Sequence, residues 1–236
     1  MVNSDLVKEM VNSDLVKEMV LAAGADLCGI ASVDRFDIAP EGFRPTDLFP
    51  DTKSVVVFAK KIPESILHSK SQIPYSFIED MALQKVLQLS FDIAVSLERE
   101  NVSALPVPSE PYEYWDKETM TGKGLLSLKH AGYLAGMGVI GRNTLLCTPE
   151  YGNLIKLGAL LVNVPLEADP IMENNMCSEK CNACITNCPS GALHDGGVDQ
   201  KKCRTYSEGS TVKGAPITVC YNCRKVCPNR SGWETA

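Results

Sequence analysis

Near its carboxyl end the chain reads Cys177-Ser-Glu-Lys-Cys181-Asn-Ala-Cys184-Ile-Thr-Asn-Cys188-Pro189. An isolated cysteine follows, and then a second run, Cys220-Tyr-Asn-Cys223-Arg-Lys-Val-Cys227-Pro228. Eight of the ten cysteines therefore lie in the last quarter of the 236 residues. Both runs end in the spacing C-x-x-C-x-x-x-C-P, which brings several thiols together in one loop. The pattern predicts thiolate ligands for a metal group.

The spacing is that of bacterial ferredoxins with two clusters, where the last cysteine of one run ligates the other cluster. A cubane cluster needs four thiolates around it, and two-residue gaps let successive sulfurs face the same core. The sequence predicts two 4Fe–4S clusters, cluster 1 on Cys177, Cys181, Cys184 and Cys227, and cluster 2 on Cys188, Cys203, Cys220 and Cys223. The first gap holds three residues instead of two, so one extra residue is expected to bulge from that loop.

Zinc and disulfide bonds are the alternative uses of these thiols. Zinc favours closed sets of four ligands, and the two Cys-Pro endings are not needed for it. Disulfides need an oxidising compartment, and no basic-then-apolar signal segment opens the chain. The two remaining cysteines, Cys28 and Cys147, have apolar neighbours in sequence, so core packing is predicted for both.

The composition is that of an acidic globular chain, with 44% hydrophobic residues and a net charge of −6. This charge argues against nucleic acid as a partner, because phosphate binding needs a concentrated basic surface. No apolar run approaches the ~20 residues that cross a bilayer. We therefore expect no membrane association and a cytoplasmic, reducing and anaerobic setting.

The chain is expected to divide into three parts. Residues 1–9 read MVNSDLVKE and recur verbatim as residues 10–18, so 1–12 is interpreted as a duplicated segment. Residues 13–170 are predicted to form an α+β (α/β-like) core, and 171–236 a ferredoxin-like lobe. Periodicity predicts helices over 14–23, 78–100 and 125–137. It predicts strands over 27–33, 54–59, 102–107, 144–147 and 157–164, with long loops over 34–52 and 60–78.

A glycine-rich segment over residues 127–166 carries a family resemblance. It reads SLKHAGYLAGMGVIGRNTLLCTPEYGNLIKLGALLVNVPL. This resembles A-G-L-G-W-I-G-K-N-T-L-L…L-G-E-L-L-T-D-L-P-L of the epoxyqueuosine reductases, which are corrinoid-dependent iron–sulfur enzymes related to the reductive dehalogenases. Residues 197–203 resemble that family's V-D-x-R-R-C, and residues 220–228 resemble its C-D-x-C-Q-x-V-C-P.

The resemblance implies a nitroreductase-like core that holds a base-off corrinoid (cobalamin), with one cluster passing electrons to it. It also implies a turn near the corrinoid, formed by Gly138, Gly141, Arg142, Asn143 and Thr144. Glycines would allow close backbone approach there. The alternative is that this segment only ends a helix and begins a strand. His130 and His194 are expected to serve in polar packing and a turn, rather than as cobalt ligands.

Two departures separate the chain from that family. The family carries its catalytic acid in a V-D-S-x-P-x-x-E-R segment, and an ungapped alignment places Gly122 at the acid's position. The chain also stops eight residues after Pro228, before the family's helical tail, so transfer RNA is expected to be an unlikely partner. Because the dehalogenases use a tyrosine as proton donor, the candidate donors are Tyr112, Tyr114, Glu118 and Tyr133.

Three functions remain open. The first is an oxidoreductase that takes electrons from a ferredoxin or flavodoxin, passes them through both clusters to cobalamin, and reduces an unknown small molecule. The second is an electron-transfer or activator protein that reduces a corrinoid or flavin bound to a partner protein. The third is a reductase whose core binds a flavin in place of the corrinoid.

Replacing one ligand should remove one cluster and leave the other. Wild-type protein reconstituted without oxygen should hold about eight iron and eight sulfide atoms, because eight thiolates fit two cubanes. Cys184→Ser and Cys227→Ser should each leave about four iron atoms in the same remaining cluster, identified by electron paramagnetic resonance. Cys220→Ser is the matched control that should remove the other cluster. Loss of different clusters in the first two variants would contradict the crossed assignment.

Overall fold

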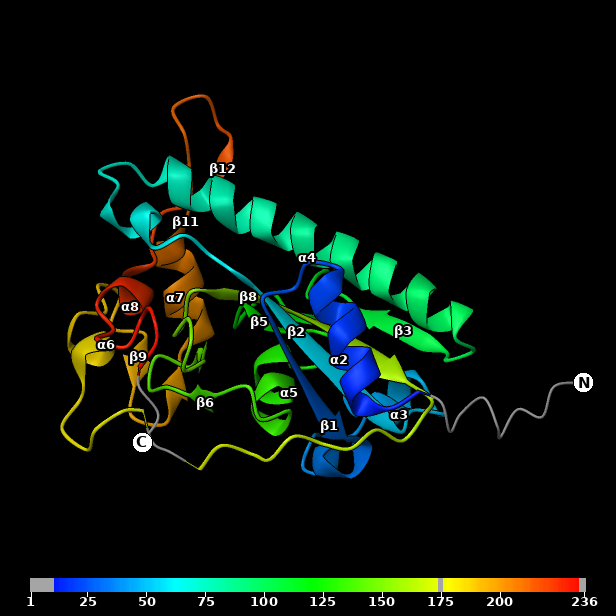
Figure 1. Ribbon diagram of the computed structural model, residues 1–236. Helices are drawn as coiled ribbons and strands as arrows, with labels where there is room; N and C mark the ends of the chain where they lie inside the picture. Colours follow the sequence, from blue (N-terminus) through cyan, green and yellow to red (C-terminus); the bar gives the residue numbers. More distant parts are fainter. Residues whose placement is uncertain (1–10, 174–175, 234–236) are drawn as a thin grey trace, which may run out of the picture.

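A four-stranded antiparallel sheet forms the centre of the computed structural model, which describes residues 11–173 and 176–233. Its strand order is β1-β2-β8-β3 (Figure 1). The strands are β1 (Leu27–Ser32), β2 (Ser54–Lys61), β3 (Ala104–Val107) and β8 (Ile155–Val162). The cysteine-rich lobe, yellow to red in Figure 1, lies beside one end of this sheet. The fold mixes helices and strands, as the sequence predicted.

Strand β2 shows why both faces of the sheet need a cover. Its sequence SVVVFAKK is rich in β-branched residues, which favour strands. Because side chains alternate along a strand, Val56 and Phe58 enter one hydrophobic core, while Val55 and Val57 enter the other. The strand is therefore buried on both sides.

Helices α2 (Ser13–Ala22) and α4 (Ile73–Arg99) cover the first face. Helix α5 (Leu128–Leu134) and neighbouring loops cover the second. Helix α4 begins five residues earlier than the predicted 78, because Pro74 lies in its first turn, where the missing N–H costs nothing. Helix α5 is shorter than the predicted 125–137, and Gly136 follows it with φ of 70°.

Several short elements lie where loops were predicted. Residues 34–52 and 60–78 contain η1 (Val33–Phe36), α3 (Pro45–Leu48) and η2 (Glu64–His68). Two hairpins precede β8, formed by β4 (Tyr114–Asp116) with β5 (Thr121–Lys123) and by β6 (Val139–Ile140) with β7 (Leu146–Cys147). Only the second of these overlaps a predicted strand, 144–147.

The cysteine-rich lobe consists of short elements. They are α6 (Ala183–Thr186), β9 (Leu193–His194), β10 (Gly197–Val198), α7 (Gln200–Ser207), β11 (Glu208–Ser210), β12 (Pro216–Thr218) and α8 (Asn222–Lys225). None of the described helices is long and apolar enough to cross a membrane. The first copy of the amino-terminal repeat, residues 1–9, lies outside the described residues.

The two isolated cysteines lie where the sequence predicted. Cys28 packs against the first core, and Cys147 is fully buried. Burial raises the pKa of the Cys28 thiol to about 12 and also raises that of Cys147. Both thiols are therefore protonated and packed in the interior at neutral pH.

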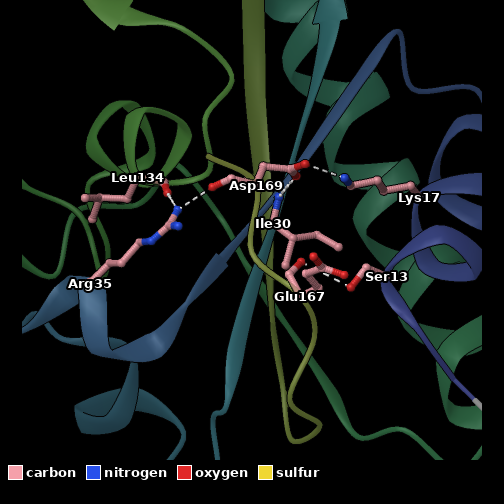
Figure 2. A network of polar contacts seen from close by, with 7 residues as sticks. All are labelled: Ser13, Lys17, Ile30, Arg35, Leu134, Glu167 and Asp169. Carbon is pink, nitrogen blue, oxygen red and sulfur yellow. Dashed lines mark hydrogen bonds and ion pairs between the residues drawn. The ribbon is translucent and has the colours of Figure 1, made fainter. Parts of the chain in front are cut away.

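A polar network fastens the segment after β8 across the core (Figure 2). The Asp169 carboxylate pairs with the Lys17 ammonium of α2 and accepts a 2.8 Å hydrogen bond from the Ile30 backbone N–H of β1. The Asp169 carbonyl accepts a 2.7 Å bond from the Arg35 guanidinium, which also donates to the carbonyl of Leu134. Asp169 and Arg35 thus join the helices on both faces to the sheet.

Asp169→Ala should lower the free energy of unfolding by about 2–3 kcal/mol, because the Ile30 N–H and the Lys17 ammonium lose a charged acceptor. Urea unfolding of the metal-free protein measures this loss. Glu18→Ala, on the exposed side of α2, is the control and should change stability by less than about 0.5 kcal/mol. Equal effects of both changes would show that the network does not hold the segment.

Candidate functional site

A cavity of about 930 Å³ lies between the core and the cysteine-rich lobe. Ligand pockets in proteins span about 300–1,000 Å³, so this one is large enough for a cofactor. It is walled by η1, the start of α5, the segment around β4 and β5, the turn after β6, and α7. Its apolar and aromatic lining includes Phe36, Phe43, Tyr112, Leu126, Leu134 and Tyr206.

One wall of this cavity carries the four thiols predicted to hold cluster 2. They are Cys188, Cys203, Cys220 and Cys223. Burial raises the pKa of Cys223 to about 11, although the neighbouring Arg224 charge opposes it. Burial and the nearby thiols Cys220 and Cys188 likewise raise the pKa of Cys203. The fold therefore gathers these four residues, which come from separate stretches of the lobe, around one space.

The four thiols predicted for cluster 1 line a second, small pocket. They are Cys177, Cys181, Cys184 and Cys227. Burial, together with neighbouring thiols of the same set, raises the pKa of both Cys184 and Cys227. The extra residue in the first gap is taken up by a turn, in which the Cys181 N–H donates to the Ser178 carbonyl at 2.9 Å. Among the described residues, no three His, Cys, Asp or Glu side chains are placed to hold a single metal ion.

The turn between β6 and β7 lies between the two spaces. It closes through hydrogen bonds from the Gly141 N–H to Leu145 O at 3.0 Å and from the Thr144 N–H to Gly141 O at 2.8 Å. The Arg142 guanidinium donates to Cys181 O at 2.9 Å on the cluster 1 side. Asn143 lines both spaces, and Thr144 lines the cavity. Arg142 thus faces the cluster 1 pocket, Asn143 lies in the wall between the two spaces, and Thr144 faces the cavity.

Asn143 carries an unpaired hydrogen-bond donor in this wall. The side chain is 3% exposed, and its Oδ1 accepts from the Leu145 N–H at 3.1 Å. Its Nδ2 has no partner among the described residues. An unsatisfied buried donor costs about 1–3 kcal/mol. The site therefore fits a bound group that supplies an acceptor, such as cluster sulfur or a cofactor oxygen.

Thr144 and Lys129 form a second unusual feature of the cavity wall. Thr144 has φ of 62°, a region that a β-branched residue rarely occupies. Its carbonyl accepts a 3.0 Å hydrogen bond from the Lys129 ammonium. Burial lowers the pKa of Lys129, and burial with the Lys129 charge lowers that of His130. Backbone strain of this kind is common at functional sites. This corner of the cavity is therefore a candidate functional region.

Three of the predicted turn residues, Gly138, Gly141 and Arg142, do not line the cavity. A Cβ atom on Gly138 would lie 2.0 Å from the Cys147 carbonyl, and one on Gly141 would lie 2.8 Å from Asn143 Oδ1. These glycines therefore allow β6 and the turn to pack closely against β7 and against the wall. Of the five residues that the resemblance places near a corrinoid, only Asn143 and Thr144 line the large cavity.

Of the four candidate proton donors, only Tyr112 lines the cavity. Tyr114 and Glu118 are exposed on the β4–β5 hairpin, and Tyr133 packs against the second core. Lys129 also lines the cavity, although the sequence pattern does not predict it as a site residue. The available signal is the lysine itself, which lies beside His130 in the largely apolar helix sequence LKHAGYL.

The position aligned with the family's acid is covered by Tyr112. A Cβ atom on Gly122 would lie 2.9 Å from the Tyr112 ring. The Arg204 guanidinium of α7 lies 4.9 Å from the ring centres of both Tyr112 and Trp115, and donates to the Tyr112 hydroxyl at 3.1 Å. This Tyr112–Arg204 contact holds the β4–β5 hairpin against α7. Gln200 of α7 also accepts a 3.1 Å hydrogen bond from the Gly122 N–H.

The charge of the cavity is opposite to that of the whole chain. Its charged lining residues are Lys123, Lys129 and Arg204, and none of the described lining residues is Asp or Glu. His130 also lines it, hydrogen-bonded through Nδ1 to the Ser127 hydroxyl at 2.7 Å. A cationic cleft in a protein of net charge −6 favours anionic groups.

No protein-family model matches the sequence. An epoxyqueuosine reductase from Bacillus anthracis is 35% identical over 127 residues, which are 50% of this chain and 33% of that protein. The chain thus matches about a third of the length of such curated relatives.

Solved structures resemble nearly the whole chain. An epoxyqueuosine reductase bound to an epoxyqueuosine-modified stem loop of tyrosine transfer RNA has a TM-score of 0.65 and 20% identity, covering 98% of this chain and 68% of that one. A catabolic reductive dehalogenase has a TM-score of 0.71 and 19% identity, covering 91% of this chain and 31% of that one. The resemblance to the epoxyqueuosine reductases that the sequence predicted is therefore confirmed, in sequence over half of the chain and in fold over nearly all of it.

Proposed function

We propose that the chain is an iron–sulfur reductase that delivers electrons from two 4Fe–4S clusters to a corrinoid in the large cavity. The observation that carries the proposal is the shared space: the four cluster 2 cysteines line the same cavity as the core residues. A cofactor in that cavity would lie against cluster 2. The chemistry of the donor set supports two clusters, because each pocket offers four thiols.

The proposed electron route begins at cluster 1. The loop between its first two ligands, residues 178–180, is exposed, so a ferredoxin or flavodoxin could approach there. Cluster 2 faces the cavity and would be the last carrier before the cofactor. Asn143 lies in the wall that borders both spaces, where its free Nδ2 suits an acceptor on either group.

The chain's own residues would bind and orient the substrate and supply a proton. A bound corrinoid supplies reducing power at its metal centre. Lys129 is the proposed proton donor, because its ammonium lies in the cavity wall and burial lowers its pKa toward the working range of an acid. The Thr144 carbonyl fixes the Lys129 ammonium at 3.0 Å. Lys123 and Arg204 would favour a small anionic substrate.

Cobalamin should co-elute with the reconstituted protein at about one per chain, and filling the cavity should prevent this. Gly124 lines the cavity, and a Cβ atom there would meet nothing closer than 3.7 Å, so Gly124→Trp can project into the space. We expect Gly124→Trp to lose cobalamin while keeping about eight iron atoms, and the matched Gly124→Ala to keep both. Absorbance spectra and iron analysis after gel filtration measure this.

The same spectra separate the other two functions. A flavin that co-elutes in place of cobalamin would support a flavin reductase. Two intact clusters with neither cofactor would instead support an electron-transfer or activator protein. Cobalamin retained by Gly124→Trp would place the binding site outside the cavity.

Epoxyqueuosine should not be reduced appreciably, even with cobalamin and a strong low-potential donor. The aligned acid is Gly122, and the Tyr112 ring occupies the space where an acid side chain would lie. A positioned general acid contributes about 10²–10⁴-fold to a rate. Turnover of epoxyqueuosine-modified transfer RNA, followed by mass spectrometry of its nucleosides, tests this. Turnover in wild type that Lys129→Met abolishes would refute the prediction and identify Lys129 as a substitute acid.

A further inference from the structure

Arg224 is a buried cation placed directly after a cluster 2 cysteine. The family pattern C-D-x-C-Q-x-V-C-P, which resembles residues 220–228, has glutamine at this position. The Arg224 side chain is only 11% exposed, and its Nη2 lies 3.7 Å from Glu79 Oε1 on α4. Its Nη1 donates to the carbonyl of Asn153. The guanidinium is therefore fixed between the core and the Cys223 loop.

The buried charges around Arg224 do not cancel. The Glu79 carboxylate also accepts a 3.2 Å bond from the Lys156 ammonium, so two cations share one anion. Burial alone would raise the pKa of Glu79, but the Arg224 and Lys156 charges outweigh it and hold the pKa below its usual value. Glu79 is thus ionised at neutral pH, and the group keeps one net positive charge.

An aromatic stack fixes this group relative to the cluster loop. Tyr75, one turn before Glu79 on α4, stacks on Tyr221 with ring centres 4.0 Å apart and planes at 15°. Tyr221 lies between Cys220 and Cys223 in sequence. Tyr75 also interacts with Glu79 and Arg224 through its hydroxyl. The distance between the charges and the cysteine loop is therefore set by packing and not by flexible surface side chains.

We propose that Arg224 and Glu79 set the reduction potential of the cluster held by Cys188, Cys203, Cys220 and Cys223. Reduction adds one negative charge to a cluster, and local charge is a main determinant of cluster potential. Arg224 stabilises the reduced form and raises the potential, while Glu79 opposes it. The charges act strongly because they are buried and escape solvent screening. This inference rests on the proposed cluster assignment.

The different burial of the cations beside the two clusters would give the proposed electron route a direction. Among the described residues that line the cluster 1 pocket, the charged one is Arg142, whose side chain is 32% exposed and lies 3.9 Å from the Asp195 carboxylate. Solvent and that carboxylate weaken its effect. Cluster 2, beside the buried Arg224, is therefore the easier of the two to reduce, and an electron entering at cluster 1 moves downhill toward the cavity.

The test is a redox titration of the reconstituted holoprotein, followed by electron paramagnetic resonance. Arg224→Gln should lower the midpoint of cluster 2 and reduce its equilibrium constant for reduction at least tenfold, which is about 59 mV for one electron. Glu79→Gln should raise the midpoint, and the double variant should return toward wild type. Arg230→Gln removes a cation that is 32% exposed and paired with Glu64, and should shift cluster 2 by less.

Opposite shifts in the two single variants would support a charge effect, because a packing defect gives no reason for the sign to reverse. Shifts of the same sign, or no shift with about eight iron atoms still bound, would overturn this inference but leave the proposed function standing. If Arg224→Gln loses iron, Arg224→Lys and Glu79→Gln carry the test, with the charge-conserving lysine expected to stay near wild type. Wild-type protein without a cluster on these cysteines would overturn both this inference and the proposed function.

Discussion

One constraint governs the two proposed cluster sites: each cluster would need four thiolates at one place, and the cysteine-rich lobe has little hydrophobic core. Among residues 176–233, the buried apolar residues are Cys184, Ala192, Leu193 and Cys227, and two of these are proposed ligands. Helices α7 and α8 contain no buried apolar residue. Burial alone therefore contributes little to placing these loops, which makes their polar attachments to the core important.

Those attachments reach the lobe from elements that the two cores already fix. Helix α4 supplies Glu79 and Tyr75, which hold the second cysteine run through Arg224 and Tyr221. The β6–β7 turn holds the first run through Arg142. Since α4 is fastened to the sheet by its apolar side, the geometry of the cluster pockets follows from the packing of the core. The same contacts that position the thiols also place charge beside them, so the proposed redox chemistry would be coupled to the packing of the core.

The sequence predicted the parts of the fold in which one local pattern dominates. The β-branched run of β2 and the long apolar periodicity of α4 are such patterns. The cysteine spacing predicts two sets of thiols, and the same two sets line the two pockets, while the cluster assignment itself stays a prediction. It missed the β4–β5 hairpin, because three-residue strands rich in exposed side chains carry no periodic signal. It also missed Lys129, whose place in the cavity wall depends on a contact with Thr144, fifteen residues away in sequence.

The Tyr112–Arg204 contact and the cationic cavity lining together explain why no acid lies at position 122, where the related family carries one. A carboxylate at position 122 would need space that the Tyr112 ring fills, and that ring is held by Arg204. The cavity instead collects Lys123, Lys129 and Arg204 on a chain that is acidic overall. A protonated lysine gives up its positive charge when it donates a proton, whereas a carboxylic acid becomes an anion. Beside the proposed cluster and a proposed anionic substrate, creating a new anion would be costly, so a cationic donor would suit this cavity better than a carboxyl group.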